Sequence, residues 1–120
     1  MARVVALGGV FVRSSDPSAL AAWYSDNLGL EFDADGAMVV LPDVGGAYAV
    51  FAFFPTSSDY IGDPASQGAM VNLRVDDLDG VTARLAGRGV AFEGVEDSEY
   101  GRFAWVTDPE GRRVELWEAR

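Results

Sequence analysis

"YGRFAWVTDPEGRRVELWE", residues 100–118, contains two apolar runs separated by a turn. The runs, Phe103 to Thr107 and Arg113 to Trp117, have the aromatic and β-branched composition of strands. Glu115 lies in the middle of the second run. A charge in a buried strand costs several kcal/mol unless a partner holds it or it faces an open cavity. The function of the protein depends largely on which explanation holds.

Outward from this stretch, the chain repeats one order of elements: a strand, a capped helix and three further strands. The first helix is expected to start at Asp16-Pro17 and end at Gly29, and the second to start after Asp77 and end at Gly87 or Gly89. Besides the two strands above, we expect strands at Val4 to Arg13, Leu30 to Phe32, Ala37 to Leu41, Ala47 to Phe54, Met70 to Val75 and Val90 to Phe92, with the turns DADG and PDVGG in the first half.

The two halves also match by position. Adding 60 to a residue number maps Asp16 onto Asp76, Gly29 onto Gly89 and Phe32 onto Phe92. We therefore predict an α+β fold in a single domain, 1–120, with βαβββ modules at 1–55 and 69–120 and a linker at 56–68. Each mixed sheet exposes the face that its helix leaves open, and two such sheets can curl into a shared cup.

The composition excludes several classes of chemistry. The chain has neither cysteine nor histidine, so thiol catalysis, disulfides and the commonest metal ligand and general base are unavailable. Its net charge is −10 and its nine basic residues are all arginine, which disfavours nucleic acid as a partner and favours a cationic ligand. No apolar run approaches the roughly 20 residues that span a bilayer, and the first residues lack the features of a secretory signal. We expect a soluble cytoplasmic protein.

Three segments resemble the vicinal oxygen chelate superfamily, which groups glyoxalase I, bleomycin-resistance proteins and extradiol dioxygenases. They are "DPSALAAWYSDNLGLEF" (16–32), "VNLRVDDLDGVTARLAGRGVAFE" (71–93) and "DPEGRRVELWE" (108–118). The resemblance covers nearly the whole chain and implies a cup-shaped mixed β-sheet barrel covered by helices, in chains that commonly form homodimers. It identifies the superfamily and says little about the activity.

The resemblance also implies four pseudo-symmetric metal-ligand positions. Counted from the helix caps and the last strand, they fall on Gly9, Ala52, Met70 and Glu115. A glycine, an alanine and a thioether cannot complete the oxygen and nitrogen ligand set that Mg, Mn, Fe or Zn prefers. We therefore expect no metal and no other cofactor.

Strand alternation predicts which side chains line the cup. Glu115 is expected to point inward, where it meets Arg13, Asn72 or Arg74, with Trp117 and Arg113 from its own strand and Phe11 from the first. Two explanations stay open for Glu115: contact with a ligand, as a catalytic base for instance, or an internal ion pair with one of these arginines.

Each of the other ligand-binding candidates also has a structural explanation that involves no ligand. Tyr60 and Tyr100 lie in loops that can overhang the cup, or pack on the surface or in a dimer. Phe54, Trp105 and Trp117 can stack on a conjugated ligand or fill the core. Arg102 can clamp an anion or be solvated.

The resulting functional hypothesis is a metal-free, glyoxalase-like protein that binds a small organic molecule in the cup and forms a homodimer. The alternative is a metal-dependent lyase, isomerase or dioxygenase with substituted ligands, or a metal-free enzyme in which Glu115 is the base and Arg74 or Tyr100 stabilises an oxyanion. A third possibility is an interaction protein whose cup is filled by Phe11, Met70 and Trp117. The sequence identifies neither the ligand nor a pathway.

Overall fold

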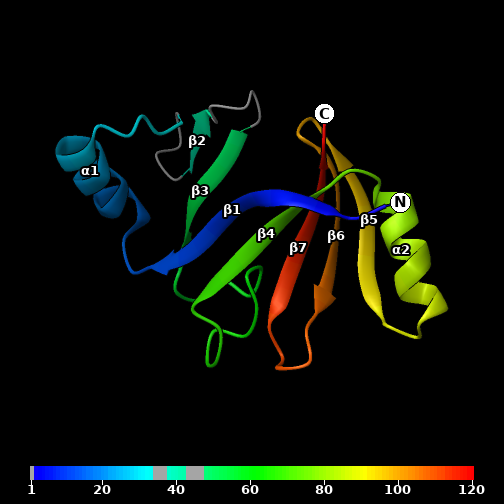
Figure 1. The fold of residues 1–120 in the computed structure, drawn as a ribbon. Helices are drawn as coiled ribbons and strands as arrows, with labels where there is room; N and C mark the ends of the chain where they lie inside the picture. The colour runs from blue at the N-terminus through cyan, green and yellow to red at the C-terminus, as the bar shows by residue number, and fades with distance from the viewer. Residues whose placement is uncertain (1, 34–37, 43–47) are drawn as a thin grey trace. The chain divides into compact units, whose positions relative to one another are not determined.

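The computed structural model describes residues 2–33, 38–42 and 48–120, which form the seven strands and two helices of Figure 1. The fold class is α+β, as predicted. By its internal contacts the chain divides into two compact units. Unit 1 consists of Met1–Gly8 and Val71–Arg120, and unit 2 of Gly9–Met70. Most of the predicted DADG and PDVGG turns lies outside the described residues.

Unit 2 is built on three strands. β1 (Val4–Ser14) enters it from unit 1 and pairs in parallel with β3 (Tyr48–Pro55), and β2 (Met38–Pro42) pairs with β3 in the antiparallel direction. Helix α1 (Pro17–Leu28) connects β1 to this pair. The prediction for the first half was a strand, a helix and three further strands, and the described residues form the first strand, the helix and two of those three strands.

The limits of α1 follow from its capping residues. Asp16 accepts a hydrogen bond from the backbone N–H of Ala19 at 3.1 Å, and Pro17 occupies the first helical position. Gly29 ends the helix in the left-handed region, with φ of 72°. On the sheet side, Tyr24 contacts the rings of Phe51 and Phe53 at centroid distances of 5.4 and 5.5 Å. The predicted helix is therefore confirmed at both ends.

The strand predicted at Leu30 to Phe32 does not form: these residues are described, and their backbone is irregular. The Phe32 ring packs 5.5 Å from that of Phe53, so the side chain is used in packing. A strand also needs a continuous ladder of backbone partners. Next to this segment, Asp33 N donates to Met38 O at 2.8 Å.

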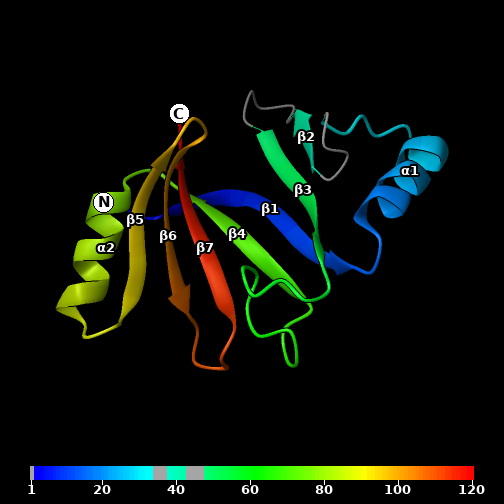
Figure 2. The ribbon, with the colours of Figure 1, turned by 180° about the vertical axis from the view of Figure 1, so that it is seen from behind.

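Unit 1 contains four neighbouring strands and one helix. The strands are β4 (Ala69–Val75), β5 (Phe92–Ser98), β6 (Gly101–Thr107) and β7 (Arg113–Ala119), in the spatial order β4-β7-β6-β5. β4 and β7 are parallel, and the other two pairings are antiparallel. Figure 2 shows β7, in red, between β4 and β6.

Helix α2 (Leu78–Gly87) covers one face of this sheet. Asp77 caps it by accepting from the N–H of Gly80 at 3.1 Å, as predicted. Its apolar side packs on a buried cluster of Val75, Leu78, Val81, Ala104 and Leu116, with Leu73, Leu85, Val106 and Val114 at the margin. The alternate residues of the strands therefore point to the other face, which we call the helix-free face of unit 1.

Candidate functional site

Four side chains form one row across the helix-free face. The strand register pairs Glu93 with Trp105, Trp105 with Glu115, and Glu115 with Asn72. Side chains of directly paired residues lie on the same face at close range. The row therefore brings two carboxylates, an indole and a carboxamide together from β5, β6, β7 and β4.

Glu115 accepts hydrogen bonds from two side chains of neighbouring strands, Asn72 and Trp105. Asn72 Nδ2 donates to Glu115 Oε1 at 2.6 Å, and Trp105 Nε1 donates to Glu115 Oε2 at 2.8 Å. The Glu115 side chain is 1% exposed, so these bonds stand where water would otherwise solvate the charge. The buried carboxylate in an apolar strand is thus explained by a polar network within the sheet.

Gly8 makes room for the Asn72 carboxamide. A Cβ atom at position 8 would overlap Asn72 Oδ1 and would lie 3.0 Å from Trp117 Cε3. Among the described residues Asn72 Oδ1 has no hydrogen-bond partner. The absence of a side chain at Gly8 therefore leaves room for the Asn72 carboxamide, whose Nδ2 reaches Glu115.

The neighbouring row is aromatic and cationic. The guanidinium carbon of Arg74 lies 4.7 Å from the ring centroid of Trp117, and Phe103 stacks on Trp117 at 6.0 Å with an angle of 5° between the ring planes. Trp117 Nε1 donates to the backbone oxygen of Tyr100 at 2.9 Å. These contacts fix the indole between a cation and a second ring.

A pocket of about 270 Å³ opens beside the first row. Arg113 lines it, with the guanidinium carbon 5.1 Å from the Trp105 ring centroid and Nη1 3.0 Å from Glu93 Oε2. The pocket is lined by Val90, Ala91, Phe92, Glu93, Trp105, Thr107 and Arg113. Aromatic walls with a few polar groups are typical of small-molecule sites.

A sequence model of the Glyoxalase family, described as the Glyoxalase/Bleomycin resistance protein/Dioxygenase superfamily, matches residues 6–116. The chain belongs to this superfamily. No curated protein matches it.

Solved structures of superfamily members share the fold. A methylmalonyl-CoA epimerase from Mycobacterium tuberculosis is 24% identical with a TM-score of 0.64, over 98% of this chain and 89% of that one. A Streptomyces coelicolor methylmalonyl-CoA epimerase variant in complex with 2-nitronate-propionyl-CoA is 16% identical with a TM-score of 0.68, over 98% and 99%. A superfamily member from Vibrio splendidus is 17% identical with a TM-score of 0.59, over 98% and 99%. At these identities the likeness concerns the fold.

In this glyoxalase-superfamily chain, half of the predicted site residues gather on the helix-free face of unit 1. They are Asn72, Arg74, Trp105, Glu115 and Trp117. Tyr100 lies next to them in the turn before β6, where its backbone oxygen accepts from Trp117. Arg13, Phe54 and Tyr60 belong to unit 2.

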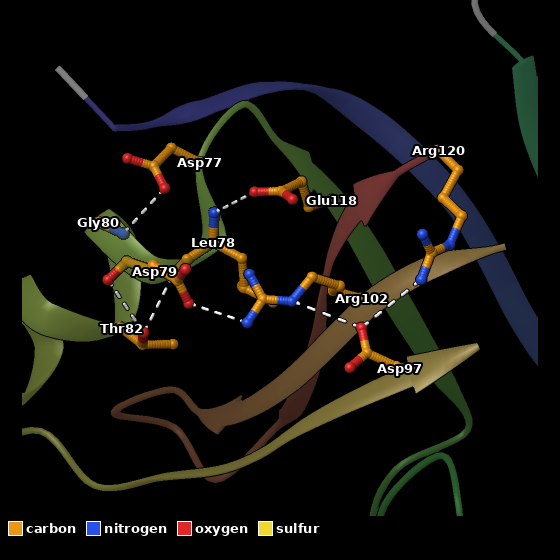
Figure 3. Close-up of polar contacts among 9 residues, drawn as sticks. All are labelled: Asp77, Leu78, Asp79, Gly80, Thr82, Asp97, Arg102, Glu118 and Arg120. Carbon is orange, nitrogen blue, oxygen red and sulfur yellow. Dashed lines mark hydrogen bonds and ion pairs between the residues drawn. The ribbon is translucent and has the colours of Figure 1, made fainter. Parts of the chain in front are cut away.

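Arg102 lies on the opposite face, which α2 covers (Figure 3). Its Nη2 contacts Asp79 Oδ1 at 2.9 Å, and its Nε lies 3.6 Å from Asp97, which Arg120 also approaches at 3.7 Å. Nearby, Glu118 accepts from the N–H of Leu78 at 2.8 Å. The arginine that was a candidate anion clamp therefore tethers the start of α2 to the sheet.

This ion pair makes stability depend on pH. The hydrogen bond and charge of Arg102 hold the pKa of the Asp79 carboxyl below its usual value. A lowered folded-state pKa gives stability that is present above the unfolded pKa of about 4 and is lost as pH falls through the folded value. Asp79→Asn should be less stable than wild type at neutral pH, and the difference should vanish in acid.

Urea unfolding of both proteins at neutral and acidic pH measures this difference, and Asp26→Asn, on exposed α1, is the control. A deficit of Asp79→Asn that stays constant down to the lowest pH would contradict the assignment.

In unit 2, Arg13 organises the long loop at 56–68. Its Nε donates to Gln67 O at 3.0 Å and its Nη2 to Gly62 O at 2.8 Å, and its Nη1 also donates to Ser58 O and Thr56 O. Tyr60, in this loop, stacks on Phe54 at 5.4 Å with an angle of 8°. An irregular loop has carbonyl groups without ladder partners, and one guanidinium supplies several donors to them.

Replacing Arg13 with glutamine should loosen this loop. We expect amide hydrogen exchange at 56–68 to become about tenfold faster or more, because several carbonyl contacts are lost together. Mass spectrometry of exchanged peptides measures the effect. The control is Arg112→Gln, which removes an arginine whose pairs are on the surface. Unchanged exchange in the loop of the Arg13 variant would show that the guanidinium does not hold it.

Six of the seven residues that line the pocket were not among the predicted ligand contacts: Val90, Ala91, Phe92, Glu93, Thr107 and Arg113. Strand alternation did predict that Arg113 lies on the same face as Glu115, although Arg113 was not counted among the ligand contacts. Glu93 was not predicted, because the predicted strand ended at Phe92, whereas β5 continues to Ser98.

In the described ranges, neither α1 nor α2 has the length and the apolar composition of a membrane-spanning helix.

Proposed function

We propose that this glyoxalase-superfamily protein binds a small organic molecule on the helix-free face of unit 1 and does so without a metal. The observation that carries the proposal is the pocket of about 270 Å³ beside Trp105, whose indole is fixed in place by Glu115. A preformed aromatic wall costs little to order when a ligand binds.

The residues at the metal positions that the family resemblance implies do not fit a metal. Glu115 is the one oxygen ligand among the four, and its two oxygens already accept from Asn72 and Trp105. At Gly9 a Cβ atom would overlap the backbone oxygen of Val50, so this position has no room for a ligand side chain. In the described part of the chain, no three acidic side chains form a group that could hold a metal ion. These features support binding without a metal.

Within this proposal Glu115 positions its neighbours. Its carboxylate sets the Trp105 indole in one orientation and holds the Asn72 carboxamide. Arg74 and Trp117 extend the same face toward the turn at Tyr100. A planar ligand can stack on such a surface, and the polar groups then select its orientation.

A thermal-shift screen of small aromatic metabolites and glycopeptide antibiotics tests the proposal. A ligand at ten times its Kd adds about 1.4 kcal/mol to stability, which corresponds to a rise in Tm of roughly 4 °C or more. We expect the shift to persist in Trp23→Phe, which changes an exposed indole on α1, and to fall in Trp105→Ala. If no compound at high concentration stabilises the protein, the proposal fails.

The alternative, a metal-dependent lyase, isomerase or dioxygenase, predicts a different result. Metal analysis of the purified and dialysed protein would then find about one equivalent of Fe, Mn, Ni or Zn. We expect much less than one equivalent, because the residues at the four positions supply one carboxylate.

We further propose, from the superfamily resemblance, that the protein is a cytoplasmic homodimer. β1 carries three large apolar side chains that are more than 40% exposed, Val4, Val5 and Leu7. Exposed apolar side chains of this kind support an association surface. Sedimentation that gives a single species near the chain mass of 12.8 kDa would contradict the dimer.

A further inference from the structure

We infer that the pocket beside Trp105 binds a small organic carboxylate, which takes the place of the Glu93 carboxylate on Arg113. This inference rests on the proposed function and names the class of ligand. The starting observation is the contact of Arg113 Nη1 with Glu93 Oε2 at 3.0 Å, between two residues that line the pocket. Glu93 then acts as an internal competitor that a ligand displaces.

The two side chains of this ion pair differ in how tightly their surroundings hold them. The Arg113 side chain is 20% exposed and lies over the Trp105 ring at 5.1 Å, so packing holds it in place. The Glu93 side chain is 71% exposed. Glu93 also precedes a register shift between Gly94 and Glu96, where the β5–β6 ladder is irregular. Glu93 is therefore the partner that can swing away.

Displacing Glu93 costs little. An ion pair with one strongly exposed partner contributes little to stability, because water solvates the released carboxylate. A ligand carboxylate would meet the same guanidinium, whose planar fork matches a carboxylate with two parallel hydrogen bonds. Unlike Glu93, the ligand would also bury its apolar part in the pocket.

The walls and the volume define the remainder of the ligand. Phe92 and Trp105 are aromatic, Val90 and Ala91 are aliphatic, and Thr107 adds a hydroxyl group. A volume of about 270 Å³ lies just below the roughly 300 to 1,000 Å³ that is usual for drug-sized ligands. The pocket therefore suits a compact acid with an aromatic or short aliphatic body.

The net charge of −10 favours cations at long range, and the local geometry opposes this. Charges further apart than about 8 Å are largely screened at physiological salt, so contact groups decide the sign of a bound ligand. At the pocket the better buried charge is the cation Arg113. An amine bound there would have to lie beside that guanidinium, which costs Coulomb energy.

Three matched probes test the inference: phenylacetate, its neutral amide 2-phenylacetamide, and 2-phenylethylamine. Binding is followed by the indole N–H signal of Trp105 in NMR titrations. We expect the acid to bind about tenfold tighter than the amide, because the guanidinium adds a charge-assisted contact. The amine should bind weakest.

Variants identify the contact. Glu93→Gln should tighten the acid several-fold, since the competitor is removed, and should raise the ratio of acid affinity to amide affinity. Arg113→Gln should abolish the preference for acid over amide, and Arg113→Lys, which keeps the charge and loses the fork, should retain part of it. Arg112→Gln, on the adjacent and exposed arginine, should change nothing. Circular dichroism establishes that each variant is folded.

The outcomes separate the inference from the proposed function. Equal affinities of the acid and the amide would show that the pocket does not select a carboxylate, while small-molecule binding would still stand. Tightest binding of the amine would show that the pocket selects a cation instead. If the Trp105 signal responds to none of the probes at concentrations of about 10 mM, the pocket does not bind ligands of this size and the proposed function fails at this site as well.

Discussion

Replacement of Glu115 with alanine is expected to lower the free energy of unfolding by about 3 kcal/mol or more. The change leaves Asn72 Nδ2 and the Trp105 indole N–H buried without their acceptor. Each buried polar group that loses its partner costs about 1 to 3 kcal/mol. A second contribution comes from the cavity left by the side chain. Urea unfolding monitored by far-UV circular dichroism measures the loss.

Two further variants make this result specific. Glu115→Gln keeps the size of the side chain but sets an NH₂ group against one of the two donors, so we expect a loss between those of alanine and wild type. Glu110→Ala removes a carboxylate that is 77% exposed in the adjacent turn and should change stability by less than about 0.5 kcal/mol. If Glu115→Ala were as stable as Glu110→Ala, the carboxylate would not hold the network.

Gly101 is the first residue of β6, and Gly101→Ala is expected to lower the free energy of unfolding by about 3 kcal/mol or more. Gly101 has φ of +135°, a region that residues with a side chain rarely adopt. Its added Cβ would also overlap the backbone oxygen of Glu118 and lie 3.0 Å from Ala119 Cα. Both obstacles are backbone atoms of β7, which cannot turn away as a side chain can.

Gly111→Ala is the matched control, because Gly111 also has a positive φ, +87°, but a Cβ there meets nothing within 4 Å. Gly111→Ala should lose only the stability that it costs to hold an alanine at a positive φ, about 1 to 2 kcal/mol. Equilibrium unfolding of both variants under the same conditions gives the comparison. Equal losses would show that contact with β7 contributes nothing, and that the conformation of the glycine alone matters.

The helices were predictable from the sequence because their signals are local. Asp16 and Asp77 cap the two helices as expected, and Gly29 ends the first. The strand β5 was less predictable, since its sequence FEGVEDS lacks apolar alternation and it forms through pairing with β6. The short segment Leu30 to Phe32 has strand-like composition, but composition does not reveal whether a partner strand is present.

The candidate site was predictable to the extent that it depends on alternation. Asn72, Arg74, Glu115 and Trp117 share a face because the side chains of a strand alternate with period two. The donor role of Trp105 depends on the register of the β6–β7 hairpin, which the sequence suggests only through its turn. Arg13 was one of three residues expected to meet Glu115, and within unit 2 its guanidinium donates to loop carbonyls. Those bonds depend on a loop conformation that no local pattern encodes.

The most direct measurement is a ¹H–¹⁵N NMR spectrum of the tryptophan indole groups, recorded before and after addition of one equivalent of Mn²⁺. Trp105 Nε1–H donates to Glu115, whereas Trp23 is 54% exposed on α1 and serves as the reference. We predict a Trp105 N–H that exchanges slowly with water and broadens no more than that of Trp23. Selective broadening of the Trp105 signal would place the paramagnetic ion at Glu115 and would contradict a carboxylate held by protein donors in a metal-free binding site.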